Sequence, residues 1–207
     1  KKEEGHPSPS KEQSSSKETF LTGTFLQLFG KDDWTPSQWE QYLSELKELR
    51  IHTLIVQYTA FKNAYNDITW FNSANTFTAQ KSRLTLARLL EAAQRQGIEV
   101  HIGLLFDDSY WQTDRAWLEL NAQRCIALAK ELHTQFGNHP AFKGWYIPHE
   151  PEPYAYGSDE KIALFREVLV NPIADAVHQW DRKPVSIAAF WNSSLTSAAQ
   201  LQHFMAE

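Results

Sequence analysis

Short apolar runs alternate with longer stretches of helical periodicity along most of this chain. The short runs are rich in β-branched and aromatic residues, which favours strands. Each run precedes a stretch whose apolar residues recur at helical spacing. Strand–helix alternation without an internal hairpin signal predicts parallel strands joined by right-handed crossovers. Five strands are expected, over residues 22–29, 53–58, 100–106, 144–147 and 184–191.

Two architectures satisfy this alternation, a doubly wound sheet and a (β/α)8 barrel of the TIM type. The turn after the first expected strand, FGKDDW at 29–34, has no glycine-rich phosphate loop, which disfavours a nucleotide-binding doubly wound sheet. A complete barrel takes about 250 residues. We therefore expect an α/β fold of the (β/α)8 TIM-barrel type over residues 20–207, truncated after about five β/α units.

Local signals predict several helix ends. Thr35 before Pro36 predicts an N-cap with proline at the first helical position, and Gly97 predicts the end of the next helix. Ser82 and Ser158 are expected to be N-caps. Pro172 is expected to kink or restart a helix. The polar and aromatic insertion between residues 59 and 80 is expected to be a long loop, and such loops are usually functional or disordered.

The first residues, KKEEGHPSPSKEQSSSKE, are too polar to bury a core, so residues 1–19 are expected to be a disordered tether. No apolar run approaches the roughly 20 residues that span a membrane, and no signal-peptide core is present. The tail suits an exported chain, which predicts an extracytoplasmic protein, periplasmic or secreted, with a lipid anchor upstream as one option. A plain frayed terminus explains the tail equally well.

The net charge of −5 and the scattered basic residues argue against a nucleic-acid partner. The single cysteine, Cys125, excludes an internal disulfide and lies among apolar residues that suit a buried thiol. His149, Glu150 and Glu152 are residue types that bind zinc or manganese, but the other histidines fall away from them. We therefore expect neither a metal nor a cofactor, and the oligomeric state stays open.

The segment from 141 to 156, AFKGWYIPHEPEPYAY, joins an expected strand to two carboxylates. Pro148 lacks the backbone donor needed to continue a strand, so Glu150 and Glu152 should follow the strand's carboxyl end. In a parallel α/β protein this edge gathers ligands and catalytic groups. We therefore expect the chemistry of the chain at this position.

Polar and aromatic residues also follow the other expected strands. Carboxylates and amides bind sugar hydroxyls, while aromatic rings such as Trp111, Trp145 and Trp191 stack on the apolar faces of sugars. Asp107 is expected to contact substrate, although paired aspartates before a helix more often cap it or stay solvated. The expected substrate-binding residues are Gln27, Gln57, Tyr58, Asp107, Trp111, Trp145, His149, Glu152, Trp191 and Asn192.

Glycoside hydrolysis needs one protonated carboxyl group and a second that acts as nucleophile or activates water. Glu150 is the candidate acid, because Trp145 and Tyr146 would supply apolar surroundings that raise the pKa of its carboxyl group. Solvated loop charges explain Glu150 and Glu152 equally well from spacing alone.

The fourth expected strand ends in His149-Glu150-Pro151, which resembles the Asn-Glu-Pro signature of the large retaining glycoside-hydrolase clan built on TIM barrels. The segments 23–27, 34–49, 53–58 and 144–150 also resemble an uncharacterised bacterial domain family within the glycoside-hydrolase barrel superfamily. The resemblance covers roughly residues 23–192. It implies a barrel acting on a polysaccharide or oligosaccharide, with Glu150 as the general acid/base.

Two departures from that clan matter. His149 stands where the clan has asparagine, so an imidazole would have to bond the sugar 2-hydroxyl. The clan's nucleophile follows strand seven, which lies beyond the given sequence. The sequence therefore predicts a glycoside hydrolase, with a non-catalytic glycan-binding or scaffolding barrel as the alternative. A cytoplasmic barrel enzyme with a phosphorylated substrate is disfavoured, because its phosphate loops would follow strands seven and eight.

Overall fold

The computed structural model describes residues 21–109, 111–190 and 192–206. The predicted tether at residues 1–19 and the predicted sugar platform Trp191 lie outside the described residues. Within the described ranges no helix is both long and apolar enough to cross a membrane.

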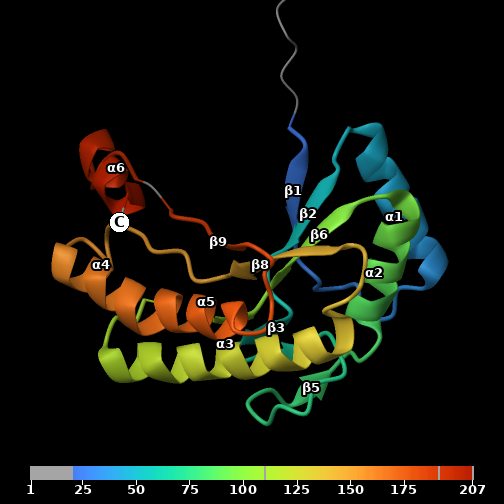
Figure 1. The fold of residues 1–207 in the computed structure, drawn as a ribbon, viewed down its shortest axis with the longest axis horizontal. Coiled ribbons are helices and arrows are strands. Elements are labelled where there is room, and N and C mark those ends of the chain that lie inside the picture. The colour runs from blue at the N-terminus through green and yellow to red at the C-terminus, as the bar shows by residue number, and fades with distance from the viewer. Residues whose placement is uncertain (1–20, 110, 191, 207) are drawn as a thin grey trace, which may run out of the picture.

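Five parallel strands form the main sheet (Figure 1). Strands that are neighbours along the chain are also neighbours in this sheet, and every pair is parallel. The chain therefore winds in one direction, unlike a doubly wound sheet, where the strand order reverses. The predicted parallel α/β fold is confirmed, while the sheet is open, with its first and last strands as edges. Its strands are β1 (Gly23–Leu26), β2 (Thr53–Val56), β6 (Glu99–Gly103), β8 (Phe142–Ile147) and β9 (Val185–Ile187).

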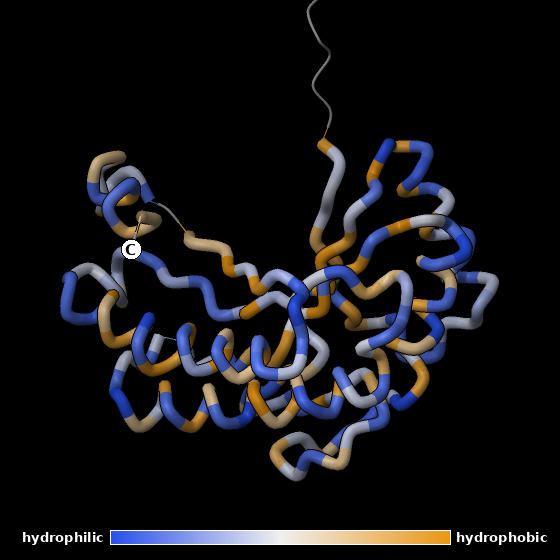
Figure 2. The backbone as a smooth tube through the Cα atoms, viewed as in Figure 1, coloured by the Kyte–Doolittle hydropathy of each residue, from blue (hydrophilic) through white to orange (hydrophobic). Residues whose placement is uncertain are grey.

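The helices follow the strands of the main sheet, as the alternation predicts. Figure 1 shows the long α3 and the neighbouring α5 running side by side below the sheet. Figure 2 shows hydrophobic residues concentrated along the central strands and hydrophilic residues on the outer helical turns. The helices are α1 (Pro36–Glu48), α2 (Thr85–Gln96), α3 (Arg115–Phe136), α4 (Asp159–Phe165), the π-helical η1 (Arg166–Val170), α5 (Asn171–His178) and α6 (Ala198–Ala206).

The two faces of the main sheet differ in burial. Leu54 of β2 and its partner Val100 of β6 are fully buried on one face. On the other face accessibility falls from the edge of the sheet to its centre, because Phe25 of β1 is 47% exposed whereas Tyr146 of β8 is 1% exposed. We call this second face the open face, and it carries Phe25, Ile55, His101 and Tyr146. In a closed barrel this face would line the interior.

Most of the predicted helix ends are confirmed. Thr35 accepts a hydrogen bond from the backbone of Gln38, whose side chain accepts one from the Thr35 backbone in return, which completes a capping box. Gly97 ends α2 with a φ of 68°, and Ser158 caps α4. Ser82 is not an N-cap, because α2 begins at Thr85. Its hydroxyl instead donates to the carbonyl of Asp32 and so joins α2 to the β1–α1 turn.

The prediction of a loop between residues 59 and 80 is wrong. Three short strands in or at the end of this segment form a second sheet, and two of them pair as an antiparallel hairpin, which the sequence did not signal. The predicted strand 100–106 is also divided, because its second half leaves the main sheet to pair with the hairpin. The second sheet has the order β5 (Gln80–Lys81), β4 (Asp67–Thr69), β3 (Ala60–Lys62), β7 (Leu105–Asp107).

The prediction that Pro172 disturbs its helix is confirmed. Proline has no N–H to donate and its ring crowds the preceding turn, so regular α-helical bonding fails there. The chain responds with the π-helical η1, in which the N–H of Asn171 donates to the carbonyl of Arg166, five residues earlier. The helix then restarts as α5, with proline in its first turn.

Gly103, the last residue of β6, lies against the backbone that leaves β2 toward β3, and this close approach requires a glycine. A Cβ atom at this position would lie 2.2 Å from the carbonyl oxygen of Gln57 and 2.4 Å from that of Val56. Because backbone cannot move aside like a side chain, Gly103→Ala is expected to lower the free energy of unfolding by about 2–3 kcal/mol. Urea unfolding measures this change. Gly23→Ala is the matched control, since its Cβ meets nothing closer than 3.4 Å, and an equal loss in both variants would contradict the prediction.

Candidate functional site

Glu150 lies just past the carboxyl end of β8, as predicted. The hydroxyl of Tyr146 donates to its Oε1 over 3.5 Å, a long contact. Burial raises the pKa of Tyr146 well above its ordinary value, and the Glu150 carboxylate raises it further. Tyr146 therefore stays a protonated donor. Its ring packs edge-on against Phe25 at 5.4 Å, so Glu150 is held above the open face.

Trp145 points to the opposite side of the sheet from Tyr146, because successive side chains alternate along a strand. Its indole is fully buried, packs against Phe142 and Trp180, and donates to Asp181 over 3.3 Å. The ring therefore has no exposed face on which a sugar could stack. The predictions that Trp145 is a sugar platform and an apolar neighbour of Glu150 do not agree with this placement.

Gln27 and Gln57 meet at the carboxyl ends of β1 and β2. The Nε2 of Gln27 donates to the Oε1 of Gln57 over 2.8 Å. The side-chain oxygen of Gln27 and the side-chain N–H groups of Gln57 take no part in this hydrogen bond, so they can bond other groups. Amide groups at this edge can bond sugar hydroxyls, and the predicted substrate contact of both residues stays a prediction.

Tyr58 is 4% exposed and belongs to the core rather than to an accessible site. Its ring contacts Phe29, Phe61 and Trp70 beneath the second sheet. Burial and the charge of Asp108 raise the pKa of Tyr58 to about 12. The predicted substrate contact of Tyr58 is therefore not available in this structure.

Asp107 ends β7 and is buried. One carboxylate oxygen accepts the backbone N–H of Ser109, and the other lies 3.5 Å from the guanidinium of Arg124. These partners give Asp107 a structural role in the turn, in place of the predicted substrate contact. Asp114, not the Asp107-Asp108 pair, caps α3. Trp111 is 58% exposed in the same connection, and its role as a sugar platform stays a prediction.

His149 is 2% exposed and packs under the loop that carries Glu150. Its ring stacks on Phe106 at 6.2 Å and meets the edge of Trp117 at 5.5 Å. Neither ring nitrogen has a hydrogen-bond partner among the described residues. Burial lowers the pKa of His149 to about 4, although the charge of Asp107 acts in the opposite direction. The expected contact with a sugar 2-hydroxyl would require exposure that this ring lacks.

The buried His149 predicts a loss of stability in acid. The unfolded chain, with a histidine pKa near 6.5, binds more protons than the folded chain between pH 6.5 and about 4, so stability rises with pH there. Acidification from pH 7 to 4 should cost the folded state about 3 kcal/mol through this group. Urea unfolding across this pH range should show that the free energy of unfolding falls less in His149→Phe than in the native protein. Parallel pH profiles in both proteins would contradict the prediction.

Glu152 organises the loop after β8. Its two carboxylate oxygens accept the backbone N–H groups of Tyr154 and Ala155, both over 2.6 Å. Asn192 has a similar role after β9, where its side chain accepts the N–H of Ser194. Both predicted substrate contacts are thus already engaged in turns, and Glu152 also borders a cavity.

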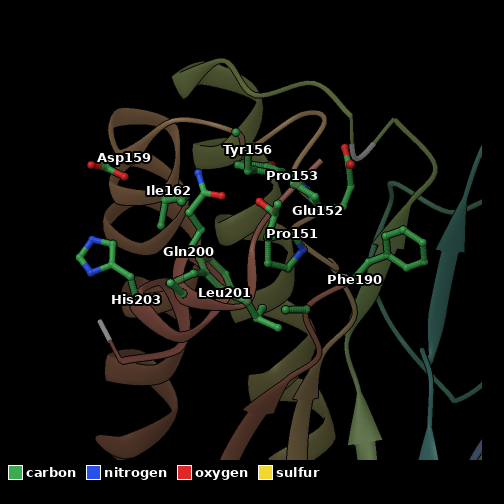
Figure 3. A pocket seen from close by; sticks show the side chains of 15 residues that line it. Pro151, Glu152, Pro153, Tyr156, Asp159, Ile162, Phe190, Gln200, Leu201 and His203 are labelled. Carbon is green, nitrogen blue, oxygen red and sulfur yellow. The ribbon is translucent and has the colours of Figure 1, made fainter. Parts of the chain in front are cut away.

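That cavity, of about 440 Å³, lies between the 151–157 loop, α4 and α6. Figure 3 shows Gln200 near its middle, with Asp159 and His203 on one side and Glu152 and Phe190 on the other. Sequence reasoning missed the contributions of Tyr156, Ile162, Gln200 and His203. Gln200 and His203 lie on α6, far along the chain from the 151–157 loop, so no local sequence signal connects them to it.

The described residues offer neither a metal site nor a reactive thiol. Among them, no group of three or more histidine, cysteine, aspartate or glutamate side chains could hold a metal ion. Cys125 is fully buried, and burial raises the pKa of its thiol to about 12. A thiol in this state is a poor nucleophile, which agrees with its predicted place in the core.

The chain is similar to several known proteins. It is 24% identical over 170 residues to the uncharacterized protein YbcH of Escherichia coli (strain K12), a match that covers 78% of this chain and 52% of YbcH. The structure superposes with a TM-score of 0.68 on a candidate α-L-fucosidase from Bacteroides thetaiotaomicron, at 19% identity over 95% of this chain and 64% of that one. A second structure, of a glycoside hydrolase, gives a TM-score of 0.51 at 14% identity over 82% of this chain and 36% of that one.

These structural similarities show a glycoside-hydrolase-like fold. The chain spans about half the length of YbcH and less than two thirds of the first structural neighbour. A family model described as a domain of unknown function, DUF4434, matches residues 21–207. Because this match covers nearly all of the sequence, the chain belongs to the DUF4434 family.

Proposed function

We propose that the protein is a glycoside hydrolase that acts on a polysaccharide or oligosaccharide, with Glu150 as its general acid/base. The observation that carries this proposal is the position of Glu150 at the carboxyl end of β8 in a glycoside-hydrolase-like fold. A carboxyl group at such an edge is fixed by the strand and faces the space where ligands bind. The names of the structural neighbours support a carbohydrate substrate.

The surrounding residues suit an acid/base role for Glu150. A neutral Tyr146 hydroxyl near Oε1 orients the carboxyl group, and leaves its other oxygen free to exchange a proton with the glycosidic oxygen. The Gln27–Gln57 pair offers amide groups to sugar hydroxyls. The half-exposed ring of Phe25 adds an apolar surface to the open face. The second carboxylate of glycoside hydrolysis is not assigned to any of these residues.

We further propose that the main sheet is the first part of a (β/α)8 barrel. Its five parallel strands follow one another in chain order, and both edge strands are available for pairing. The accessible open face supports this proposal, because closure would turn that face inward. Of this chain, 95% aligns with the candidate fucosidase and 82% with the second structure, and both of those chains are longer.

The alternative is a barrel that binds glycan without cleaving it. The buried imidazole of His149 favours this alternative, because it leaves the residue beside Glu150 unable to contact a sugar hydroxyl. Incubating the intact protein with a panel of glycans and measuring released reducing ends separates the two functions. An enzyme releases new ends, whereas a binding protein changes the glycan's mobility in affinity electrophoresis and releases none.

The polar residues 1–19 support an extracytoplasmic location, periplasmic or secreted, with a lipid anchor upstream as one form of attachment. Fractionation of the native host tests this proposal. Recovery of the protein with cytoplasmic markers would contradict it.

A further inference from the structure

The cavity beside the 151–157 loop is placed to receive part of the substrate. Its wall begins at Pro151, the residue after Glu150, so the proposed acid stands at its border. The carbonyl of Pro151 accepts the N–H of Phe190 over 3.1 Å, which fixes the loop after β8 against the segment after β9. A volume of about 440 Å³ falls within the range of small-molecule binding sites.

The lining combines apolar surface with a few polar groups. Pro151, Tyr156 and Ile162 contribute apolar surface, and Leu201 and Phe204 of α6 complete it. Tyr156 is held firmly, since it is 4% exposed and packs edge-on against Phe165 at 4.9 Å. Figure 3 shows the side chain of Gln200 near the middle of the cavity. An apolar surface with an amide at its centre suits the ring of a sugar, which has apolar faces and hydroxyl edges.

The charges around the cavity restrict what it can hold. Glu152 and Asp159 border it from opposite sides, and Glu150 precedes its first residue. Among the described residues that line the cavity there is no lysine or arginine, and His203 and Tyr156 are the titratable side chains besides these carboxylates. An anionic group would approach several carboxylates without a compensating cation, which is unfavourable in a partly enclosed space.

We propose that this cavity binds the sugar unit adjacent to the glycosidic bond that Glu150 protonates, and that it selects neutral saccharides over uronic-acid and sialylated ones. The inference rests on the proposed function, because it takes Glu150 as the acid. Filling the cavity should therefore weaken binding of neutral saccharides without altering the position of Glu150.

Two neighbouring alanines of α6 provide a matched pair of variants. Ala199 lines the cavity and Ala198 does not, while both are exposed. In the intact protein carrying Glu150→Gln to prevent turnover, Ala199→Trp should weaken binding of a neutral probe about tenfold or more, and Ala198→Trp should leave it unchanged. The probes are 2′-fucosyllactose and cellotetraose, compared with the anionic 3′-sialyllactose and tetragalacturonate. Titrations followed by amide chemical shifts measure affinity and identify the residues contacted.

The expected result is that at least one neutral probe shifts the amides of the 151–157 loop and of α6, and binds at least about tenfold more tightly than the anionic probes. Equal effects of Ala199→Trp and Ala198→Trp, equal affinity for anionic probes, or no shift with any neutral probe would each overturn the inference. If the neutral probes shift only amides of the open face, the inference about the cavity is overturned and the proposed function stands. If the Glu150→Gln variant still hydrolyses glycan, the proposed role of Glu150 is contradicted. Amide shifts in the 151–157 loop and α6 would still show binding in the cavity.

Discussion

Replacing Glu150 with glutamine is expected to lower the rate of glycan hydrolysis by about 10²- to 10⁴-fold, with little change in sugar binding. Glutamine has nearly the same shape, but its amide cannot donate a proton to the leaving oxygen. The hydroxyl of Tyr146 can still donate to the amide oxygen at this position, so the loop should keep its arrangement. Reducing-end release measures turnover, and calorimetric titration measures binding.

The nature of the leaving group gives a sharper test of the acid role. A 2,4-dinitrophenyl glycoside departs as a stable anion and needs little protonation, so its cleavage should suffer far less from Glu150→Gln than cleavage of a natural glycan. A purely structural role of Glu150 would slow both substrates alike. That outcome would contradict the assignment, as would unchanged turnover of the natural glycan.

Glu152→Gln is the matched control, because this carboxylate stands two residues away on the same loop. Its oxygens accept the N–H groups of Tyr154 and Ala155, and a glutamine oxygen retains part of that capacity. Turnover should therefore fall by less than about tenfold. A loss equal to that of Glu150→Gln would show that loop geometry, and not the proton on Glu150, limits the reaction.

The main sheet could be predicted because each of its strands is specified locally. Continuous apolar runs such as TLIV at 53–56 favour strands covered on both sides, and capping signals such as Thr35 separate the helices from them. The second sheet could not be predicted, because its strands are two or three residues long and depend on distant partners. The hydroxyl of Thr59, for example, donates to the carbonyl of Gly103 from 44 residues away.

The strand end that precedes Glu150 could be predicted from the sequence, but the orientation of the side chains on that strand could not. Trp145 and Tyr146 are adjacent and similar, yet one faces the helices and the other faces Glu150. A strand that is buried on both faces lacks the polar alternation that would distinguish them.

Strand-end residues can also serve the core instead of the site. Tyr58 and His149 both join an aromatic cluster that exists only because the second sheet folds over that edge. Because no sequence signal predicts this sheet, the sequence alone predicts that both residues are accessible. Gln27 and Gln57 instead lie at strand ends where their side chains bond each other, and their predicted contact with substrate stays a prediction.

A second large effect is expected far from Glu150, at Asp181, which immediately precedes the connection to β9. Its side chain is 4% exposed. Asp181 Oδ2 accepts from Trp145 Nε1 at 3.3 Å and lies 3.1 Å from the ammonium of Lys183 and 3.2 Å from the ring of His133. Asp181→Ala would leave the buried indole of Trp145 and the partly exposed Lys183 and His133 without their shared acceptor. The free energy of unfolding should fall by about 3–5 kcal/mol, as measured by urea denaturation.

Asp175→Ala is the control for this loss, because Asp175 is an exposed aspartate of the neighbouring α5 and its removal should change stability by less than about 0.5 kcal/mol. The loss of stability in Asp181→Asn should lie between those of Asp181→Ala and Asp175→Ala, since an amide retains one acceptor oxygen but not the charge. A loss below about 1 kcal/mol in Asp181→Ala would contradict the view that this carboxylate joins α3, β8 and β9.

The pH dependence of the same variants identifies the charge as the source of the stability. Burial acts to raise the pKa of Asp181, but the N–H and ammonium groups of Lys183 and the ring of His133 outweigh it, so the pKa lies below the ordinary value of 3.8. Below that value the unfolded chain binds the proton more readily than the folded chain, and stability falls as the pH falls through the folded pKa. The advantage of the native protein over Asp181→Asn should therefore be constant from pH 7 to about 5 and shrink below about pH 4. An advantage that persists undiminished at pH 3 would mean that Asp181 acts through packing and not through its charge.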